Sequence, residues 1–427
     1  MNRATAALFV FVFLGGFLAL EPSPLRGGLL GLGVVAADSP PAKAGDRPPA
    51  LVEIDRRIRE GFWDPRLKGV DWSAAVERAA RELSQAKSEA DRDAAYDRLL
   101  DTLADSHTFR LPARRVPPTG WGTAGLRIGR DGDGYAVKGV LPGGSAEGAG
   151  IQIGDRILAI GGRPYGAERV RFRELFLALE GFPRASLDVR WRRGGGAART
   201  SPLILAPEPP GDSLVWKSAR MVRRSGKAFV YVRLWGISSE TALAVVDLLS
   251  DRRATAHVKP ELAGLEEAEG ILLDVRGNGG GYDPDILATF LRGRWSSDDY
   301  FVRDRDGRRP FPAEYRPLPV ALLVNSGTAS AGEALALKFR RHRSGPIVGE
   351  ETAGMLSGGA SIGALPDGST LWFSARMIED AEGRSYEGRG VSPDVPVADR
   401  PPGAPGEEDA VVEAAIRALV QTARPAP

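Results

Sequence analysis

The stretch of residues 319–338, PVALLVNSGTASAGEALALK, limits the folds open to this chain more than any other stretch. Five consecutive apolar residues, Val320–Val324, precede a turn of small polar residues and a helix-forming segment that begins at Glu333. This order predicts a buried strand, a tight turn and a helix. Ser330 would lie at the start of the helix, where free N–H groups and the helix dipole favour an anion. Ser330 is therefore a candidate nucleophile, and capping of the helix by Ser330 or Thr328 is the alternative.

The composition predicts several domains and excludes some chemistries. With 427 residues, the chain exceeds one ordinary domain and should form two or three. The 57 Lys and Arg against 55 Asp and Glu give a net charge of +2, so no nucleic-acid partner is indicated. The chain has no cysteine, which excludes disulfides, thiolate metal sites and cysteine nucleophiles. With three histidines besides, no metal site is expected.

The N-terminus predicts export. Arg3 precedes an apolar run, Ala4–Leu20, and Val35–Ala37 offers a small-residue cleavage site. Residues 1–37 are therefore interpreted as a signal peptide, which places the chain in the periplasm, outside the cell or on the outer side of the inner membrane. An uncleaved anchor that holds the chain at the membrane is the alternative, because the apolar run could just span a bilayer. Residues 38–50, rich in Pro and Ala, predict a linker.

Residues 51–115 predict a helical domain. Apolar residues recur there at intervals of three and four, and Asp71 is placed to cap a helix that begins at Trp72 or Ser73. A last helix, about residues 92–104, leads into Asp105-Ser106-His107-Thr108. Taken alone, a histidine at a helix end is more often structural than catalytic.

Residues 116–208 predict a separate β-rich domain with Gly-rich turns. Strands are expected at 124–128, 135–140 and 187–191, with one helix at 171–179. Within it, GSAEGAGI (144–151) and GDRILAI (154–160) resemble the circularly permuted PDZ domain of bacterial proteases.

The PDZ resemblance implies a peptide-binding edge. By that resemblance, Gly125, Leu126, Arg127 and Ile128 correspond to the carboxylate-binding loop and strand, which take an extended peptide at a sheet edge. A PDZ fold kept only as a spacer or lid is the alternative.

Residues 209–400 alternate between predicted strands and helices. The strands are expected at 228–234 and 270–275, and the helices at 239–249 and 285–291, which indicates βα units on a partly parallel sheet. We expect residues 251–268, which include His257, to be an irregular surface insertion. A hairpin is expected between 361–365 and 370–375, with its turn at Asp367–Ser369. Residues 401–427 predict a linker and an amphipathic C-terminal helix, about 408–423.

A glycine-rich loop follows the predicted strand at 270–275. In GNGGG (277–281), successive backbone N–H groups could form an anion-binding nest. The loop lacks the Gly-Lys-Ser/Thr ending of a nucleotide-binding P-loop, and no lysine follows in the next helix. The remaining interpretation of this loop is an oxyanion hole, for which the N–H of Ala331 would be the second donor.

The motifs DVRGNGGG, VNSGTASAGEAL, VGEETAG and EGRGVSPD, in that order, resemble the S41 family of serine peptidases, the tail-specific or C-terminal processing peptidases. The resemblance covers most of the chain after residue 50. It implies a ClpP/crotonase-like α/β core, Ser330 as the nucleophile, and Gly279 or Gly280 with Ala331 as the oxyanion hole.

One departure from the family pattern concerns the general base. Where Ser-Lys processing peptidases carry a lysine, this chain has Met355. Lys338 lies eight residues beyond Ser330 on the same predicted helix, about 12 Å away at 1.5 Å per residue, which is too far for a base.

The other branch of the family, similar to the tricorn core protease, carries a Ser-His pair ahead of the PDZ domain and a Glu near the end of the core. Ser106, His107 and Glu387 match these positions. The resemblance therefore implies that His107 takes the proton of Ser330, that Ser106 orients His107, and that Glu387 acts behind them through hydrogen bonds. A serine needs such an oriented base, because it is a weak nucleophile alone.

These features together predict an exported serine endopeptidase that works through an acyl-enzyme and needs no cofactor. Its expected partners are unfolded or tail-exposed polypeptides. Two alternatives remain open, a catalytically inactive peptide-binding module and an esterase or amidase that acts on small substrates.

Overall fold

The computed structural model describes residues 47–117, 121–168, 170–282, 285, 287, 291, 301–304, 307–310, 318–400 and 409–422. The predicted signal or anchor (1–37), most of the linker at 38–50, most of the helix at 285–291 and the linker at 401–408 lie outside these residues. No helix within the described residues has both the length and the apolarity needed to cross a membrane.

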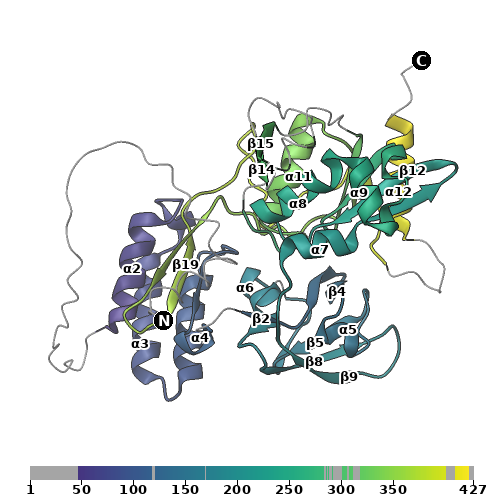
Figure 1. The fold of residues 1–427 in the computed structure, drawn as a ribbon. Helices are drawn as coiled ribbons and strands as arrows, with labels where there is room; N and C mark the ends of the chain where they lie inside the picture. Colours follow the sequence, from purple (N-terminus) through teal and green to yellow (C-terminus); the bar gives the residue numbers. More distant parts are fainter. Residues whose placement is uncertain are drawn as a thin grey trace.

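The N-terminal part is a helical layer completed by strands from far along the chain (Figure 1). Its helices are α2 (Pro49–Gly61), α3 (Trp72–Gln85) and α4 (Glu89–Asp101), with short 3-10 turns at Leu67–Gly69 and Ala113–Arg115. Asp71 accepts a hydrogen bond from the N–H of Ala74, so the predicted cap is confirmed.

A three-stranded antiparallel sheet packs on these helices. It has the order β1 (Phe109–Leu111), β19 (Thr370–Ser374), β18 (Ala360–Ala364), and Phe109 pairs with Trp372. The predicted hairpin is thus confirmed, but it joins the N-terminal helices: Leu365, Leu371 and Phe373 are buried in the same hydrophobic cluster as α2, α3 and α4. The sequence alone did not indicate this pairing, because it joins segments more than 250 residues apart.

The PDZ-like part contains two sheets, and the predicted strands and helix are present with shifted bounds. The larger sheet has the order β3 (Leu126–Asp131), β4 (Gly134–Val140), β5 (Arg156–Ile160), β8 (Ser186–Arg192), β9 (Arg199–Ile204), with β6 (Arg163–Pro164) on β5. The smaller one has the order β10 (Ala206–Pro207), β2 (Gly122–Thr123), β7 (Glu180–Gly181). The predicted helix at 171–179 divides into α6 (Phe172–Leu175) and a 3-10 turn (Leu177–Leu179), and α5 is Ser145–Gly148.

The core is a six-stranded, mostly parallel sheet, as the alternation of strands and helices predicted. Its order is β11 (Arg220–Arg224), β12 (Lys227–Arg233), β13 (Gly270–Asp274), β16 (Val320–Val324), β17 (Ile347–Gly349), β20 (Val395–Pro396), and only β11 runs antiparallel to its neighbour. A separate hairpin is formed by β14 (Phe301–Asp304) and β15 (Gly307–Pro310).

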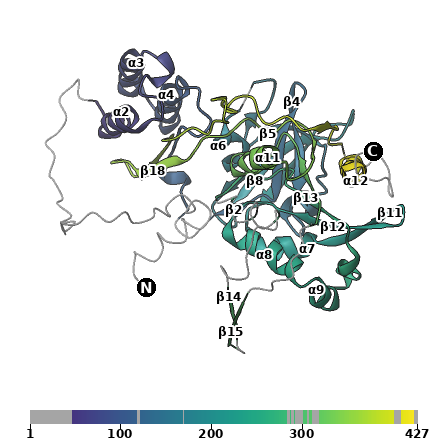
Figure 2. The same cartoon turned by 90° about the horizontal axis from the view of Figure 1, so that it is seen from above.

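Both faces of the core sheet are covered, which explains why its central strands β13, β16 and β17 are almost entirely apolar. One face packs against α7 (Gly211–Ser218), α8 (Ser239–Ser250) and α11 (Ala331–His342), and the other against α12 (Ala410–Thr422) (Figure 2).

The prediction for residues 251–268 was wrong. They contain α9 (Arg252–Val258) and two 3-10 turns, Pro260–Leu262 and Leu265–Glu267. Leu262, Leu265 and Ala268 are buried in the main core, so the segment is part of the helical layer, while His257 and Val258 face solvent.

Candidate active site

Two loops at the carboxyl edge of the parallel sheet form the centre of the site. They follow the neighbouring strands β13 and β16, and loops in this position meet because parallel strands end at the same edge. The Asn325 side chain ties the loops together: its Oδ1 accepts hydrogen bonds from the N–H groups of Gly277 at 2.8 Å and Gly327 at 2.9 Å. The Thr328 hydroxyl adds a bond to the carbonyl of Val275 at 2.8 Å.

Ser330 lies directly before α11, so the predicted strand, turn and helix are confirmed. Its backbone has φ 51° and ψ −120°, a conformation that is strained for a residue other than glycine. The Ser330 N–H donates to the carbonyl of Met355 at 3.0 Å, which fixes the turn against the segment that follows β17. Met355, at the position where the lysine was missing, therefore contributes its backbone to the site.

Glu333 is a buried residue of the site that the sequence analysis did not identify. Its carboxylate accepts hydrogen bonds from the Thr352 hydroxyl at 2.5 Å, from the N–H groups of Gly354 and Met355 at 2.8 Å, and from the N–H of Ser330 at 3.2 Å. Burial raises the pKa of Glu333 to about 7, although these hydrogen bonds oppose the shift. The Ser-x-x-Glu spacing of a capping box was the available signal.

The structure brings Ser106, His107 and Glu387 together, although Glu387 comes 281 residues after Ser106. The hydroxyl Oγ of Ser106 lies 2.8 Å from Nδ1 of His107. The carboxylate of Glu387 accepts hydrogen bonds from the N–H groups of Ser106 and Leu356, both at 2.8 Å. These three residues form a connected unit, as the resemblance implied.

Asp105 fixes the loop that carries the histidine. Its Oδ1 accepts hydrogen bonds from the N–H of His107 at 3.2 Å and from the hydroxyls of Thr108 and Ser374 at 2.8 and 2.7 Å. Ser374 belongs to β19, so the hairpin that completes the N-terminal part also supports His107.

Burial controls the charge states in this unit. The pKa of His107 is lowered to about 4 by burial, with Asp105 opposing the shift, so the imidazole is neutral at ordinary pH. The pKa of Glu387 is raised to about 7 by burial and by Asp105, while hydrogen bonds from Ser106 and Leu356 favour the charged form. The neutral imidazole has the free lone pair that a base needs, and burial makes it a weaker base than an exposed histidine.

The histidine unit and Ser330 are joined through residues 355 and 356, which bind Ser330 and Glu387 respectively. No hydrogen bond between Ser330 and His107 is present among the described residues. Instead, the ring of Phe172, from α6 of the PDZ-like part, stacks on the imidazole with 4.5 Å between ring centroids. In this arrangement the PDZ-like part covers the imidazole.

The glycine loop lies against Ser330. A Cβ on Gly280 would be 2.5 Å from Cβ of Ser330, so only glycine fits there. The N–H of Gly280 donates to Oδ1 of Asn278 at 2.8 Å. In the part of the chain that the structure describes, the N–H groups of Gly279 and Ala331 have no hydrogen-bond partner. These N–H groups are the available donors for an anion beside Ser330.

The four PDZ residues, Gly125–Ile128, lie at the edge of the larger β sheet, where β3 is the terminal strand. All four are buried, and Leu126 and Ile128 belong to the hydrophobic cluster of the PDZ-like part. The hydroxyl of Ser326 donates to the carbonyl of Arg130 at 2.6 Å, and the guanidinium of Arg127 pairs with Glu208 at 2.9 Å. The expected peptide edge and the turn before Ser330 are therefore neighbours.

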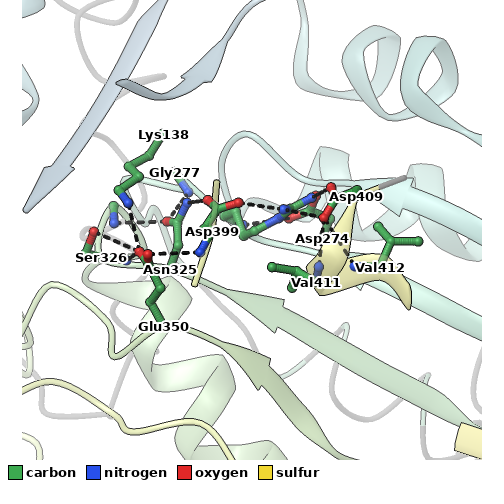
Figure 3. A network of polar contacts seen from close by, with 12 residues as sticks. Lys138, Asp274, Gly277, Asn325, Ser326, Glu350, Asp399, Asp409, Val411 and Val412 are labelled. Carbon is green, nitrogen blue, oxygen red and sulfur yellow. Dashed lines mark hydrogen bonds and ion pairs between the residues drawn. The ribbon is translucent and has the colours of Figure 1, made fainter. Parts of the chain in front are cut away.

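A network of polar and charged side chains, most of them buried, links the PDZ-like part and the core (Figure 3). Arg276, after β13, pairs with Asp274, Asp399 and Asp409 at 2.6–2.8 Å, and Asn325 donates to Asp399 at 2.6 Å. Further along, the PDZ-like part and the core are joined by an ion pair between Lys138 and Glu350 at 2.9 Å. No group of three or more metal-ligating side chains with the geometry to hold a metal ion occurs within the described ranges.

Comparison with known families agrees with this geometry. Residues 229–397 match the sequence model of Peptidase family S41, and residues 114–172 match that of the PDZ domain. The core belongs to peptidase family S41. S41 enzymes are serine-type peptidases, and the matched region carries the glycine loop, Ser330 and Glu387, while the PDZ match separates them from His107.

Relatives of this S41 chain fall on both branches of the family. It is 28% identical over 400 residues to tricorn protease homolog 1 of Streptomyces coelicolor, covering 87% of this chain and 35% of that protein. It is 29% identical over 375 residues to the chloroplastic C-terminal processing peptidase of Tetradesmus obliquus, covering 81% of this chain and 76% of that one. The chain spans about a third of the length of its Streptomyces relatives, 30% and 35%.

The fold is similar to that of the solved photosystem II D1 C-terminal processing protease. The TM-score is 0.53 at 23% sequence identity, and the match covers 82% of this chain and 92% of that structure. This similarity supports the fold of all three parts.

Proposed function

We propose that this protein is an exported serine endopeptidase that hydrolyses peptide bonds of unfolded or tail-exposed polypeptides through an acyl-enzyme at Ser330. The observation that carries the proposal is the unit of Ser106, His107 and Glu387. Residues from two distant segments form it, Ser106-His107 and Glu387, and the S41 core has Met355 where a catalytic lysine would stand.

The roles follow from the hydrogen bonds. If Nδ1–H of His107 donates to Oγ of Ser106, then Nε2 keeps its lone pair for the proton of Ser330. The carboxylate of Glu387 accepts a hydrogen bond from the N–H of Ser106 at 2.8 Å and so lies behind the Ser106-His107 pair. Glu387 thereby favours the tautomer that can act as a base and stabilises the imidazolium after proton transfer.

The chemical steps use these groups in order. Oγ of Ser330 attacks the peptide carbonyl and gives its proton to His107, and the oxyanion is held by the N–H groups of Ala331 and Gly279. Gly280 was the other expected donor, but its N–H is bonded to Asn278. His107 then protonates the leaving amine. Water attacks the acyl-enzyme with His107 again as base, and Ser330 is released.

The substrate class rests on the PDZ-like part and on the relatives. A PDZ fold binds an extended chain end at a sheet edge, here Gly125–Ile128, and the algal relative is named a C-terminal processing peptidase. The apolar run near the N-terminus supports export. The peptide-binding edge close to Ser330 favours a peptidase over an esterase or amidase that acts on small substrates. The connected unit of Ser106, His107 and Glu387 favours an enzyme over a module that only binds peptides.

The test is degradation of casein by the full-length protein, compared with Ser330→Ala, His107→Ala and Met355→Lys. We expect the first two variants to lose at least 10³-fold in rate. A lysine at position 355 should not take over the role of His107 as base. The double variant His107→Ala/Met355→Lys should therefore stay inactive. Full activity of His107→Ala would reject the role of His107 as general base. A wild-type protein that binds casein but does not cleave it would favour the inactive peptide-binding module.

A further inference from the structure

A cavity lies where the PDZ-like part meets the glycine loop. Its volume of about 100 Å³ is enough for one side chain rather than for a length of peptide. Gly279–Gly281 form one wall, and the others carry aromatic and polar side chains, among them Phe172, Phe176, Trp235, Trp121 and Glu180. Because Gly280 touches Ser330, this cavity is next to the place where a peptide bond would be cut.

Two polar groups of the cavity have no partner among the described residues. The side chain of Glu180 is half-buried and makes no hydrogen bond or ion pair there. The indole N–H of Trp121 is buried without an acceptor. The nearby cation does not satisfy Glu180, since Arg127 is paired with Glu208 at 2.9 Å. A buried donor without an acceptor, such as the Trp121 N–H, is costly in a folded protein and indicates that a ligand completes it.

We propose that this cavity is a substrate subsite for a lysine or arginine residue beside the scissile bond. The cation of that residue would pair with Glu180, and its aliphatic stem would pack on the rings of Phe172 and Phe176. The indole N–H of Trp121 would donate to a carbonyl of the peptide backbone. A basic peptide residue supplies both a cation and a carbonyl, so it satisfies both groups at once.

The charges around the cavity agree with this assignment. Arg127 is paired with Glu208, so Glu180 has no cation of its own among the described residues. Burial raises the pKa of Glu180 to about 8, and Glu208 adds to the shift while Arg127 opposes it. A neighbouring cation favours the charged form of a carboxylate. A basic substrate residue would therefore offset the free-energy cost that burial adds to the charged form of Glu180.

This inference rests on the proposed peptidase activity, and the first experiment measures specificity. The full-length protein and Glu180→Gln would be incubated with a library of unstructured peptides, and the cut sites mapped by mass spectrometry. We expect Lys and Arg to be enriched about tenfold at one position next to the cut site in the wild type, and this enrichment to disappear in Glu180→Gln. The exposed Glu266→Gln is the control and should show the same cut-site preference as wild type. Equal cut-site preferences in wild type and Glu180→Gln would overturn the proposal.

A second experiment does not require cleavage. Binding of two peptides that differ only by lysine or norleucine at the tested position would be measured with Ser330→Ala, alone and combined with Glu180→Gln. A preference for lysine that Glu180→Gln removes supports the subsite even if the protein proves inactive, which would reject only the peptidase proposal. Cleavage of peptides with no lysine preference in binding would reject the subsite and leave the peptidase proposal intact.

Discussion

The ring of Phe172 stacks on the imidazole of His107, with 4.5 Å between their centroids. The two residues come from different parts of the molecule, the PDZ-like part and the loop after α4. The contact helps to exclude water from the candidate base, whose pKa is lowered to about 4 by burial. The position of the PDZ-like part and the protonation of His107 are thereby coupled.

Phe172→Ala should raise the pKa of His107 from about 4 towards its ordinary value of 6.5, because water would reach the imidazole. The measurement is an NMR titration of the histidine ring protons, which is practical because the chain has three histidines. In activity, the acidic limb of the pH profile of kcat/KM should move to higher pH. Phe182→Ala, an exposed aromatic of the same part, is the control and should leave both unchanged. An unchanged His107 titration in Phe172→Ala would show that other residues bury the ring.

Ser106→Ala should lower kcat by about 10²-fold or more, with a smaller effect on KM, because His107 loses the group that selects its tautomer. Ser106→Thr keeps the hydroxyl and should recover part of the loss, which a merely structural role would not predict. Steady-state kinetics on a peptide substrate give both values, with the exposed Ser84→Ala as control. Activity of Ser106→Ala within twofold of wild type would contradict the role of Ser106.

Glu333→Gln should change how stability depends on pH. The pKa of Glu333 is raised from 4.5 to about 7 in the folded protein, so its contribution to stability is present below pH 4.5 and lost as pH rises through about 7. Glutamine does not titrate. The difference in free energy of unfolding between wild type and variant should therefore fall by about 3 kcal/mol between pH 4.5 and 8. Urea unfolding at several pH values measures this difference, with Glu266→Gln as the exposed control. A difference that stays constant with pH would show that the pKa of Glu333 is not raised in the folded protein.

Lys138→Met should destabilise the contact between the PDZ-like part and the core. Its ammonium is buried and pairs with Glu350 at 2.9 Å, so removal leaves a carboxylate without its partner, at a cost of about 3 kcal/mol. The double variant with Glu350→Gln should be less destabilised than the sum of the single variants. A double-mutant cycle in urea unfolding gives this coupling, and additive effects would mean that the pair contributes nothing.

Local features of the sequence determined much of the fold. Residues 320–330 predicted a strand, a turn and a helix start because an apolar run, small polar residues and helix formers follow one another within a few residues, and the structure has them there. The alternation of strands and helices predicted the partly parallel sheet for the same reason. Where apolar spacing was less regular, at 251–268, the prediction failed, since burial of Leu262 and Leu265 depends on packing against other elements.

The sequence also named Ser106, His107 and Glu387, but through a family resemblance and not through any property of these residues alone. Only the tertiary structure could show that Glu387 binds the N–H of Ser106, since 281 residues lie between them. The tertiary structure was also needed to show that Glu333 is buried, that the ring of Phe172 stacks on His107, and that Glu180 has no hydrogen-bond or ion-pair partner among the described residues. A sequence determines local conformation through neighbouring residues, whereas charge states and contacts at a site depend on which distant segments exclude water from it.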